Sequence, residues 1–144
     1  MRADIDIVVS SADSTESLLV VETKLSDRDP SIPETQLKQY MLQLSCPVGL
    51  IVTPEKMWLY ADRYTSRNPD SIERIGEFAI GHLLQFKSGS EASFQDAVQH
   101  WLENLPQTAS SERVNNSDLW RALNIYVLPA IETGKVRAAV PRHR

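Results

Sequence analysis

The sequence predicts an α/β fold, of the α+β kind with one mixed β-sheet. Two patterns support this prediction. Short apolar runs bounded by polar or turn residues are typical of strands, and they recur at residues 4–9, 18–24, 48–52 and 57–61. Apolar residues at helical spacing follow the second run and dominate the second half of the chain. The 144 residues are enough for one domain with a real hydrophobic core.

The first two runs are joined by a short polar segment and predict a β-hairpin. Asp4 and Asp6 lead the first strand, and the second strand ends in Glu22 and Lys24. Because alternate side chains on a strand share a face, Glu22 and Lys24 should point the same way, about 7 Å apart. The hairpin would bring Asp4 or Asp6 beside this pair.

A helix and a second hairpin are predicted next. Pro33 suits the first turn of a helix that runs to about Leu44, and Pro47 stops it. Leu37 and Met41 belong to its apolar face. The runs at residues 48–52 and 57–61 then form two strands around a turn.

The second half is predicted to be helical. Residues 70–86 open with a capping-box pattern and have an apolar stripe, which predicts a helix. A further helix is expected over residues 94–105, a polar linker over 106–117, and a last helix over 118–128. From residue 134 onward the chain is expected to be loose and basic. We therefore divide the chain into a main domain, residues 1–105, and a C-terminal part, residues 106–144.

The composition is that of an ordinary globular protein, with 42% apolar and 24% charged residues. No apolar stretch is long enough for a membrane span, and no signal peptide is evident, so we expect a cytoplasmic protein without membrane contact. Cys46 is the only cysteine. It suits a reducing compartment, and we expect it to be buried rather than nucleophilic. The net charge of −4 is not typical of nucleic-acid binding, yet does not exclude it.

Strand-borne acids beside a lysine suit metal-assisted hydrolysis of a phosphodiester. Magnesium prefers carboxylate oxygens, which Asp4 and Glu22 could supply, and it lowers the pKa of a bound water. Lys24 could orient that water or offset negative charge in the transition state. The competing interpretation is a plain surface salt bridge at a strand end.

These residues resemble the PD-(D/E)XK nuclease superfamily. The resemblance rests on Asp4, on the strand that ends in Glu22-Thr-Lys24, and on a following helix with Gln36 and Tyr40 four residues apart. Arg2-Ala3-Asp4 is in particular similar to the nuclease domain of type I restriction motor subunits. The resemblance covers about residues 2–62.

The resemblance implies a restriction endonuclease-like core, with additional C-terminal helices. It implies Asp4 and Glu22 as ligands of Mg²⁺, with Mn²⁺ as a substitute, Lys24 as the catalytic lysine, and Gln36 and Tyr40 as substrate-binding residues. It further implies an endonuclease acting on DNA in restriction or repair, as a homodimer or in a larger complex. Asp6 remains a rival of Asp4 for the first ligand.

One departure from the family bears on activity. The family core begins with a helix and a strand before the Asp strand, whereas Met1 stands three residues before Asp4. Residues 1–105 would thus be a nuclease domain without its first helix and strand, because the chain is truncated, because its start is misassigned, or because later helices fill that space. A catalytically inactive member of the same fold, acting as a nucleic-acid-binding or protein-interaction module, is therefore the alternative.

Two further alternatives stay open at this point. Gln36 and Tyr40 could equally form an ordinary half-buried helix face. Trp58 and Tyr60 alternate on a predicted strand and could stack on bases, although packing within the sheet is the favoured interpretation. An unrelated α/β interaction domain, in which Glu22 and Lys24 form a salt bridge only, is a third and weaker possibility.

Overall fold

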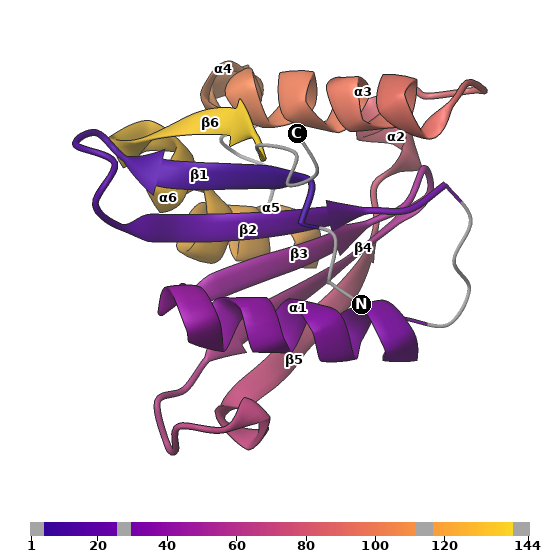
Figure 1. Ribbon diagram of the computed structural model, residues 1–144. Coiled ribbons are helices and arrows are strands. Elements are labelled where there is room, and N and C mark those ends of the chain that lie inside the picture. The colour runs from indigo at the N-terminus through magenta and orange to yellow at the C-terminus, as the bar shows by residue number, and fades with distance from the viewer. Residues whose placement is uncertain (1–4, 26–29, 112–116, 140–144) are drawn as a thin grey trace.

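A computed structural model describes residues 5–25, 30–111 and 117–139, which fold around one six-stranded β-sheet (Figure 1). The strands are β1 (Ile7–Ser11), β2 (Ser17–Thr23), β3 (Val48–Val52), β4 (Lys56–Asp62), β5 (Ile72–Ala79) and β6 (Gly134–Ala138). The α-helices are α1 (Ser31–Leu44), α2 (Gly81–Leu84), α3 (Glu91–Glu103), α4 (Leu105–Ser111), α5 (Asp118–Ala122) and α6 (Leu128–Thr133). A 3₁₀ turn, Pro69–Ser71, precedes β5, and a π-helical segment, Leu123–Val127, joins α5 to α6.

The sheet is mixed, as the sequence predicts. Its strand order is β5-β4-β3-β2-β1-β6. Strands β2 and β3 pair in parallel, with α1 as the crossover between them, and the other neighbours pair antiparallel. Both predicted hairpins, β1–β2 and β3–β4, are present. The α/β fold class with one mixed sheet is therefore confirmed.

Helices cover both faces of the sheet. On one face α1 packs over β2 and β3, and the buried residues there form what we call the α1-side core. On the other face a larger cluster joins the sheet to α3, α4, α5 and α6. In Figure 1, α1 crosses in front of the strands, while α3 and α4 lie along the β6 edge. The alternating side chains of β2 to β4 contribute to the two clusters in turn, as a pleated sheet requires.

Helix α1 packs on β3 at a glycine, where the absence of a Cβ atom makes room for its apolar side chains. A Cβ atom at Gly49 would lie 2.7 Å from the Sδ atom of Met41 and 3.1 Å from a methyl carbon of Leu37. Both apolar side chains are fully buried, and their spacing of four residues puts them on one helix face. The helix ends at Leu44, where the sequence predicts, because Ser45 adopts the left-handed conformation, with φ of 53°.

The helix predicted over residues 70–86 is wrong for most of its length, since residues 72–79 form β5. The misleading pattern was the spacing of Ile72, Ile75 and Ala79, three and four residues apart, which is typical of one helix face. Their spacing has another origin, because Leu59 pairs with Gly76 while Tyr60 pairs with Arg74. Ile75 is the extra residue of a β-bulge, which shifts the alternation of the strand by one position.

The C-terminal part also differs from expectation. Helix α4 occupies residues 105–111, so the predicted linker is wrong there, and residues 112–116 lie outside the described part of the chain. Helical structure continues through Pro129, because this proline lies in the first turn of α6, where a missing N–H group costs little. Residues 134–138 are not loose, since they form β6, which pairs with the whole of β1, and residues 140–144 lie outside the described part of the chain.

The start of β6 depends on the glycine there. A Cβ atom at Gly134 would lie 2.5 Å from the carbonyl oxygen of Ser10 and 2.9 Å from that of Ala130. Backbone atoms cannot move aside as a side-chain end can. We expect Gly134→Ala to lower the free energy of unfolding by about 1 to 3 kcal/mol, measured by urea denaturation.

Gly81→Ala is the matched control, because its Cβ would make only ordinary contacts, 3.4 Å from the Pro54 carbonyl oxygen. This variant should be neutral or slightly more stable. Equal stability of the two variants would show that β6 does not approach β1 as closely as described.

Candidate functional site

Glu22 and Lys24 form an ion pair at the carboxyl end of β2. The Nζ atom of Lys24 lies 3.4 Å from Oε2 of Glu22. The Glu22 side chain is 0% exposed, and the Lys24 side chain is 32% exposed. The prediction that both side chains point the same way is therefore confirmed. A carboxylate so deeply buried costs several kcal/mol unless a cation compensates it, and Lys24 supplies that charge from the solvent side.

The position of this pair follows from the sheet. Glu22 pairs with Ile51 on β3, and the N–H group of Lys24 donates to the carbonyl oxygen of Val52 at 2.9 Å. The pair thus lies where the parallel strands β2 and β3 end and the chain leaves for α1. In open α/β sheets, ligands bind outside the carboxyl ends of parallel strands. Glu22 and Lys24 are located where such a site is expected.

Asp6 lies beside β2, as the hairpin predicts, but its carboxylate is turned toward Thr23. Its Oδ2 atom accepts hydrogen bonds from the Thr23 N–H group at 2.7 Å and from the Thr23 hydroxyl at 2.9 Å. Because side chains alternate on a strand, the hydroxyl of Thr23 points away from Glu22 and Lys24. Asp6 therefore orders the end of the hairpin. Asp4, its rival as first ligand, lies outside the described residues.

Gln36 and Tyr40 lie on α1 and are both half-buried. Tyr40 packs against the α1-side core. Their burial matches the half-buried helix face that the sequence left open as an alternative. Their role in substrate binding stays a prediction.

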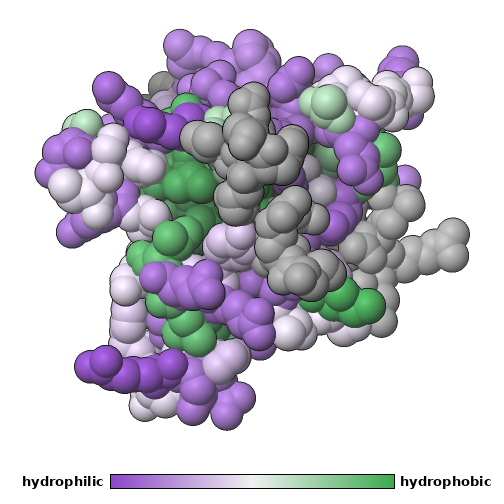
Figure 2. Space-filling model, viewed as in Figure 1, coloured by the Kyte–Doolittle hydropathy of each residue, from purple (hydrophilic) through white to green (hydrophobic). Residues whose placement is uncertain are grey.

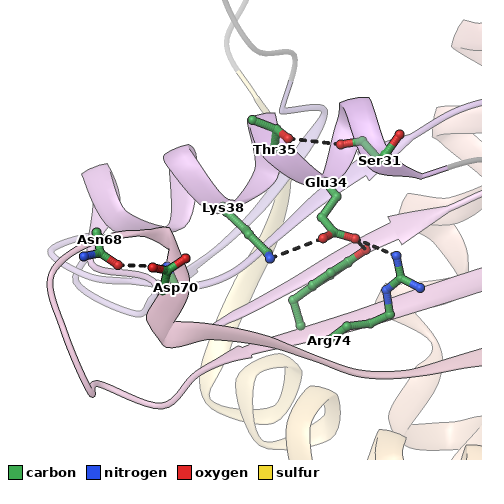
Figure 3. Close-up of polar contacts among 8 residues, drawn as sticks. Ser31, Glu34, Thr35, Lys38, Asn68, Asp70 and Arg74 are labelled. Atoms are coloured by element: carbon green, nitrogen blue, oxygen red, sulfur yellow. Dashed lines mark hydrogen bonds and ion pairs between the residues drawn. The ribbon is translucent and has the colours of Figure 1, made fainter.

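A polar cluster that sequence reasoning missed ties α1 to the far strands of the sheet. Oε1 of Glu34 accepts hydrogen bonds from the Tyr60 hydroxyl at 2.8 Å and from Nη2 of Arg74 at 2.7 Å, and Oε2 lies 3.2 Å from Nζ of Lys38 (Figure 3). Only the Glu34–Lys38 pair, four residues apart on one helix, could have been found from spacing. Tyr60 and Arg74 are 26 and 40 residues away from Glu34, on β4 and β5.

The cluster lowers the pKa of the Glu34 carboxyl group and raises the pKa of the Tyr60 hydroxyl group. Burial on its own raises the pKa of Glu34, but the hydrogen bonds from Arg74, Tyr60 and Lys38 outweigh it and hold this pKa below its ordinary value. Burial, reinforced by the neighbouring Glu34 carboxylate, raises the pKa of Tyr60. The ionised Glu34 and the neutral Tyr60 are thus the forms that the fold favours.

Two other sequence expectations are confirmed. Cys46 is fully buried, its Sγ donates to the Val48 carbonyl oxygen at 3.3 Å, and burial raises its pKa to about 11, which rules out a ready nucleophile. Trp58 and Tyr60 are 1% and 0% exposed. Both pack in the sheet beneath α1 and so cannot stack on bases.

The donor set bears on the expected metal. Within residues 5–25, 30–111 and 117–139, no group of three or more His, Cys, Asp or Glu side chains could hold a metal ion. Magnesium is commonly bound by one or two carboxylates, with waters and substrate phosphates completing the shell. Glu22 together with Asp4 would fit that number, and Glu22 is the member of the expected pair that the structure describes.

Comparisons with protein-family models, with curated proteins and with solved structures found no match. The fold and the geometry of the site therefore define the class of this protein as a mixed α/β domain with an ion pair at the end of its central strand. The resemblance to PD-(D/E)XK nucleases stays a hypothesis.

The Glu34 cluster yields a pH prediction. Because the folded pKa of Glu34 lies below its ordinary value of 4.5, its stabilisation is present above that pH and is lost as the pH falls through the folded pKa. We expect Glu34→Gln to lower the free energy of unfolding by about 1 to 3 kcal/mol at pH 7. The difference from the native chain should shrink below pH 4.5. Urea denaturation at several pH values measures this.

Glu55→Gln is the control, because Glu55 is exposed in the β3–β4 turn. It should follow the native chain at every pH. A Glu34→Gln deficit that stays constant down to the acid limit would mean that the charge of Glu34 is not what stabilises the fold.

Proposed function

We propose that this chain is a magnesium-dependent nuclease-like domain that hydrolyses phosphodiester bonds of DNA, with a role in restriction or repair. The observation that supports it most is the buried Glu22, ion-paired to Lys24 at the carboxyl end of β2. An acid and a lysine at this point of a mixed sheet are what phosphodiester hydrolysis with a hard metal ion requires. The strand order around the pair is consistent with this proposal.

The resemblance would require a strand and a helix before Asp4, and elements from the C-terminal half of the chain could take their place. Strand β6 pairs with the outer edge of β1, and α3 packs against β2 and β6 on the face opposite α1. Later elements of the chain thus occupy the space beside the Asp strand. This arrangement supports a nuclease-like core whose sheet is completed from the C-terminal part.

In the proposed reaction each residue has one task. Glu22 and Asp4 would hold the magnesium ion, which would polarise the phosphate and lower the pKa of a bound water. Lys24 lies 3.4 Å from the Glu22 carboxylate, and its side chain is 32% exposed, so a phosphate could reach it from solvent. There it would offset the negative charge that builds up as water attacks phosphorus and the leaving oxygen departs.

The alternative is a catalytically inactive member of the same fold that binds nucleic acid or protein. One observation favours it, because Glu22 is wholly buried and already neutralised by Lys24. A charge pair of this kind can serve the fold alone. Metal binding separates the two proposals.

DNA is the proposed partner of the nuclease-like domain, with a homodimer or a larger restriction or repair complex as the assembly. We also propose a cytoplasmic location, since the single cysteine suits a reducing compartment. Among the described helices, none has the length and apolar character to cross a membrane.

Removal of the lysine tests the catalytic assignment. We expect Lys24→Ala to reduce DNA cleavage by at least about 100-fold, because the charge that stabilises the transition state is lost. Lys24→Arg keeps the ion pair but not the geometry of the ammonium group, and should also cleave poorly while remaining folded. Cleavage of labelled DNA with Mg²⁺, with circular dichroism as the folding check, measures both.

Lys87→Ala, at an exposed lysine that is not part of the ion pair, is the control and should cleave like the native chain. If a folded Lys24 variant retained full activity, the assignment of Lys24 would be wrong.

Metal binding tests Glu22. We expect the native chain to bind Mg²⁺ or Mn²⁺ in isothermal titration calorimetry, and Glu22→Gln to bind at least about tenfold more weakly. Glutamine keeps the shape of the side chain but lacks the negative charge that attracts the ion. Glu34→Gln removes a carboxylate outside the site and should leave metal affinity unchanged. A native chain that binds neither metal would favour the inactive alternative.

A further inference from the structure

Strand β6 forms one edge of the sheet and presents two exposed cations, Lys135 and Arg137. Lys135 pairs with Ser10 of β1, and Arg137 pairs with Val8. Residues directly opposite each other on antiparallel strands share a face of the sheet. Between them, Val136 faces the other way and packs into the larger core cluster. Burial of Val136 thus fixes the side of the sheet to which both cations point.

That side is the one on which α1 and the Glu22–Lys24 pair lie. Val8 pairs with Val20 of β2, and both belong to or pack against the α1-side core. Glu22 and Lys24 follow Val20 at alternate positions on the same strand face. Arg137 lies level with Val20, four residues before Lys24, so the two cations are about 13 Å apart along the strand direction. The spacing from β6 past β1 to β2 adds a separation of about 10 Å across the sheet.

Most cations of the described chain are neutralised, but these two are not. Six of the ten described lysines and arginines form ion pairs with carboxylates: Lys24, Lys38, Lys56, Arg63, Arg74 and Arg121. The other four are Arg67, Lys87, Lys135 and Arg137. Within the described part of the chain, the Arg137 guanidinium donates a hydrogen bond to the hydroxyl of Ser14, at 3.4 Å. Half of the cations without an ion pair therefore stand on one face of one strand.

The opposite edge of the sheet shows that this is not a general way of protecting an edge. Strand β5 also has charged side chains, which discourage pairing with other chains. They are balanced within the fold, since Glu73 pairs with Arg63, Arg74 with Glu34, and Glu77 with Lys56. A strand at the edge of the sheet can thus be made polar without excess positive charge. The uncompensated positive charge of β6 therefore suits an anionic partner.

The surface supports the same conclusion. Helix α1 packs over β2 and β3, not over β6. Figure 2 shows strongly hydrophilic side chains over β6, next to an apolar area over the adjoining ends of β1 and β2. Among the described helices, α1 therefore leaves β6 uncovered on the α1 side of the sheet.

We propose that Lys135 and Arg137 form a phosphate-binding edge that holds the DNA backbone on the α1 side of the sheet and directs it toward the Glu22–Lys24 pair. This inference rests on the proposed function, because it takes DNA as the ligand. Contacts of lysine and arginine with phosphates position a protein on DNA without reading the sequence. An edge of this kind also explains how a chain with net charge −4 could bind a polyanion.

The salt dependence of DNA binding tests the inference. Each phosphate contact steepens the fall of log affinity with log salt by about 0.9. We expect the double variant Lys135→Gln/Arg137→Gln to show a slope shallower by about 2 and an affinity at least about tenfold lower at 50 mM salt. Fluorescence anisotropy of a labelled 20-base-pair duplex, with Ca²⁺ in place of Mg²⁺, would measure both.

Arg67→Gln/Lys87→Gln is the matched control, because it removes the same two types of charge from the other exposed cations without an ion pair. It should bind DNA like the native chain. Equal losses in the two double variants would mean that net charge alone governs binding and would overturn the proposal.

The remaining outcomes separate this inference from the proposed function. If the native chain cleaves DNA and the β6 variant binds it unchanged, the inference is wrong and the proposed function stands. Self-association of that variant with unchanged affinity would also overturn it, because the cations would then only protect the edge. If the native chain binds DNA through β6 but does not cleave it, the inference holds and the catalytic proposal falls. A native chain that binds no DNA overturns both.

Discussion

The close approach of α1 to β3 at Gly49 is the contact on which the rest of the fold depends. With no Cβ atom there, Leu37 and Met41 reach the sheet and fasten the crossover between its two parallel strands. The parallel pair becomes the centre of the sheet, and antiparallel strands extend it on both sides. The end of β2 is then central and shielded by α1, so the acid at this point is buried and must be compensated by charge.

Charge compensation recurs through the molecule, and it differs with burial. Glu22 is wholly buried and relies on Lys24, whereas Glu34 is partly exposed and collects three donors from α1, β4 and β5. The first arrangement leaves a cation at the mouth of a candidate site. The second locks the helix that covers that site to the far strands. The first would keep the carboxyl end of β2 rigid, as a site that acts on phosphate needs.

The elements that sequence reasoning missed share a physical cause. The stripe that suggested a helix at residues 72–79 arose from a bulge, and a bulge depends on the partner strand, which spacing cannot reveal. The sequence of β6 suggested a loose tail because Lys135 and Arg137 are polar. An edge strand nevertheless needs only one half-buried apolar side chain, here Val136, and a neighbouring strand with an unpaired edge, here β1. The Glu34 cluster joins residues far apart in sequence, so only its helical pair could be foreseen.

The sequence by itself determined the α/β class, both hairpins, the helix between them and the common face of Glu22 and Lys24, because each follows from local periodicity of 2 or 3.6 residues. Tertiary structure alone decided the order of the strands and placed residues 72–79 and 134–138 at the two edges of the sheet. It also decided that the Asp6 carboxylate points toward Thr23. These features depend on which partner is left when the central strands have paired. Long-range packing determines this pairing, so local sequence patterns do not predict it.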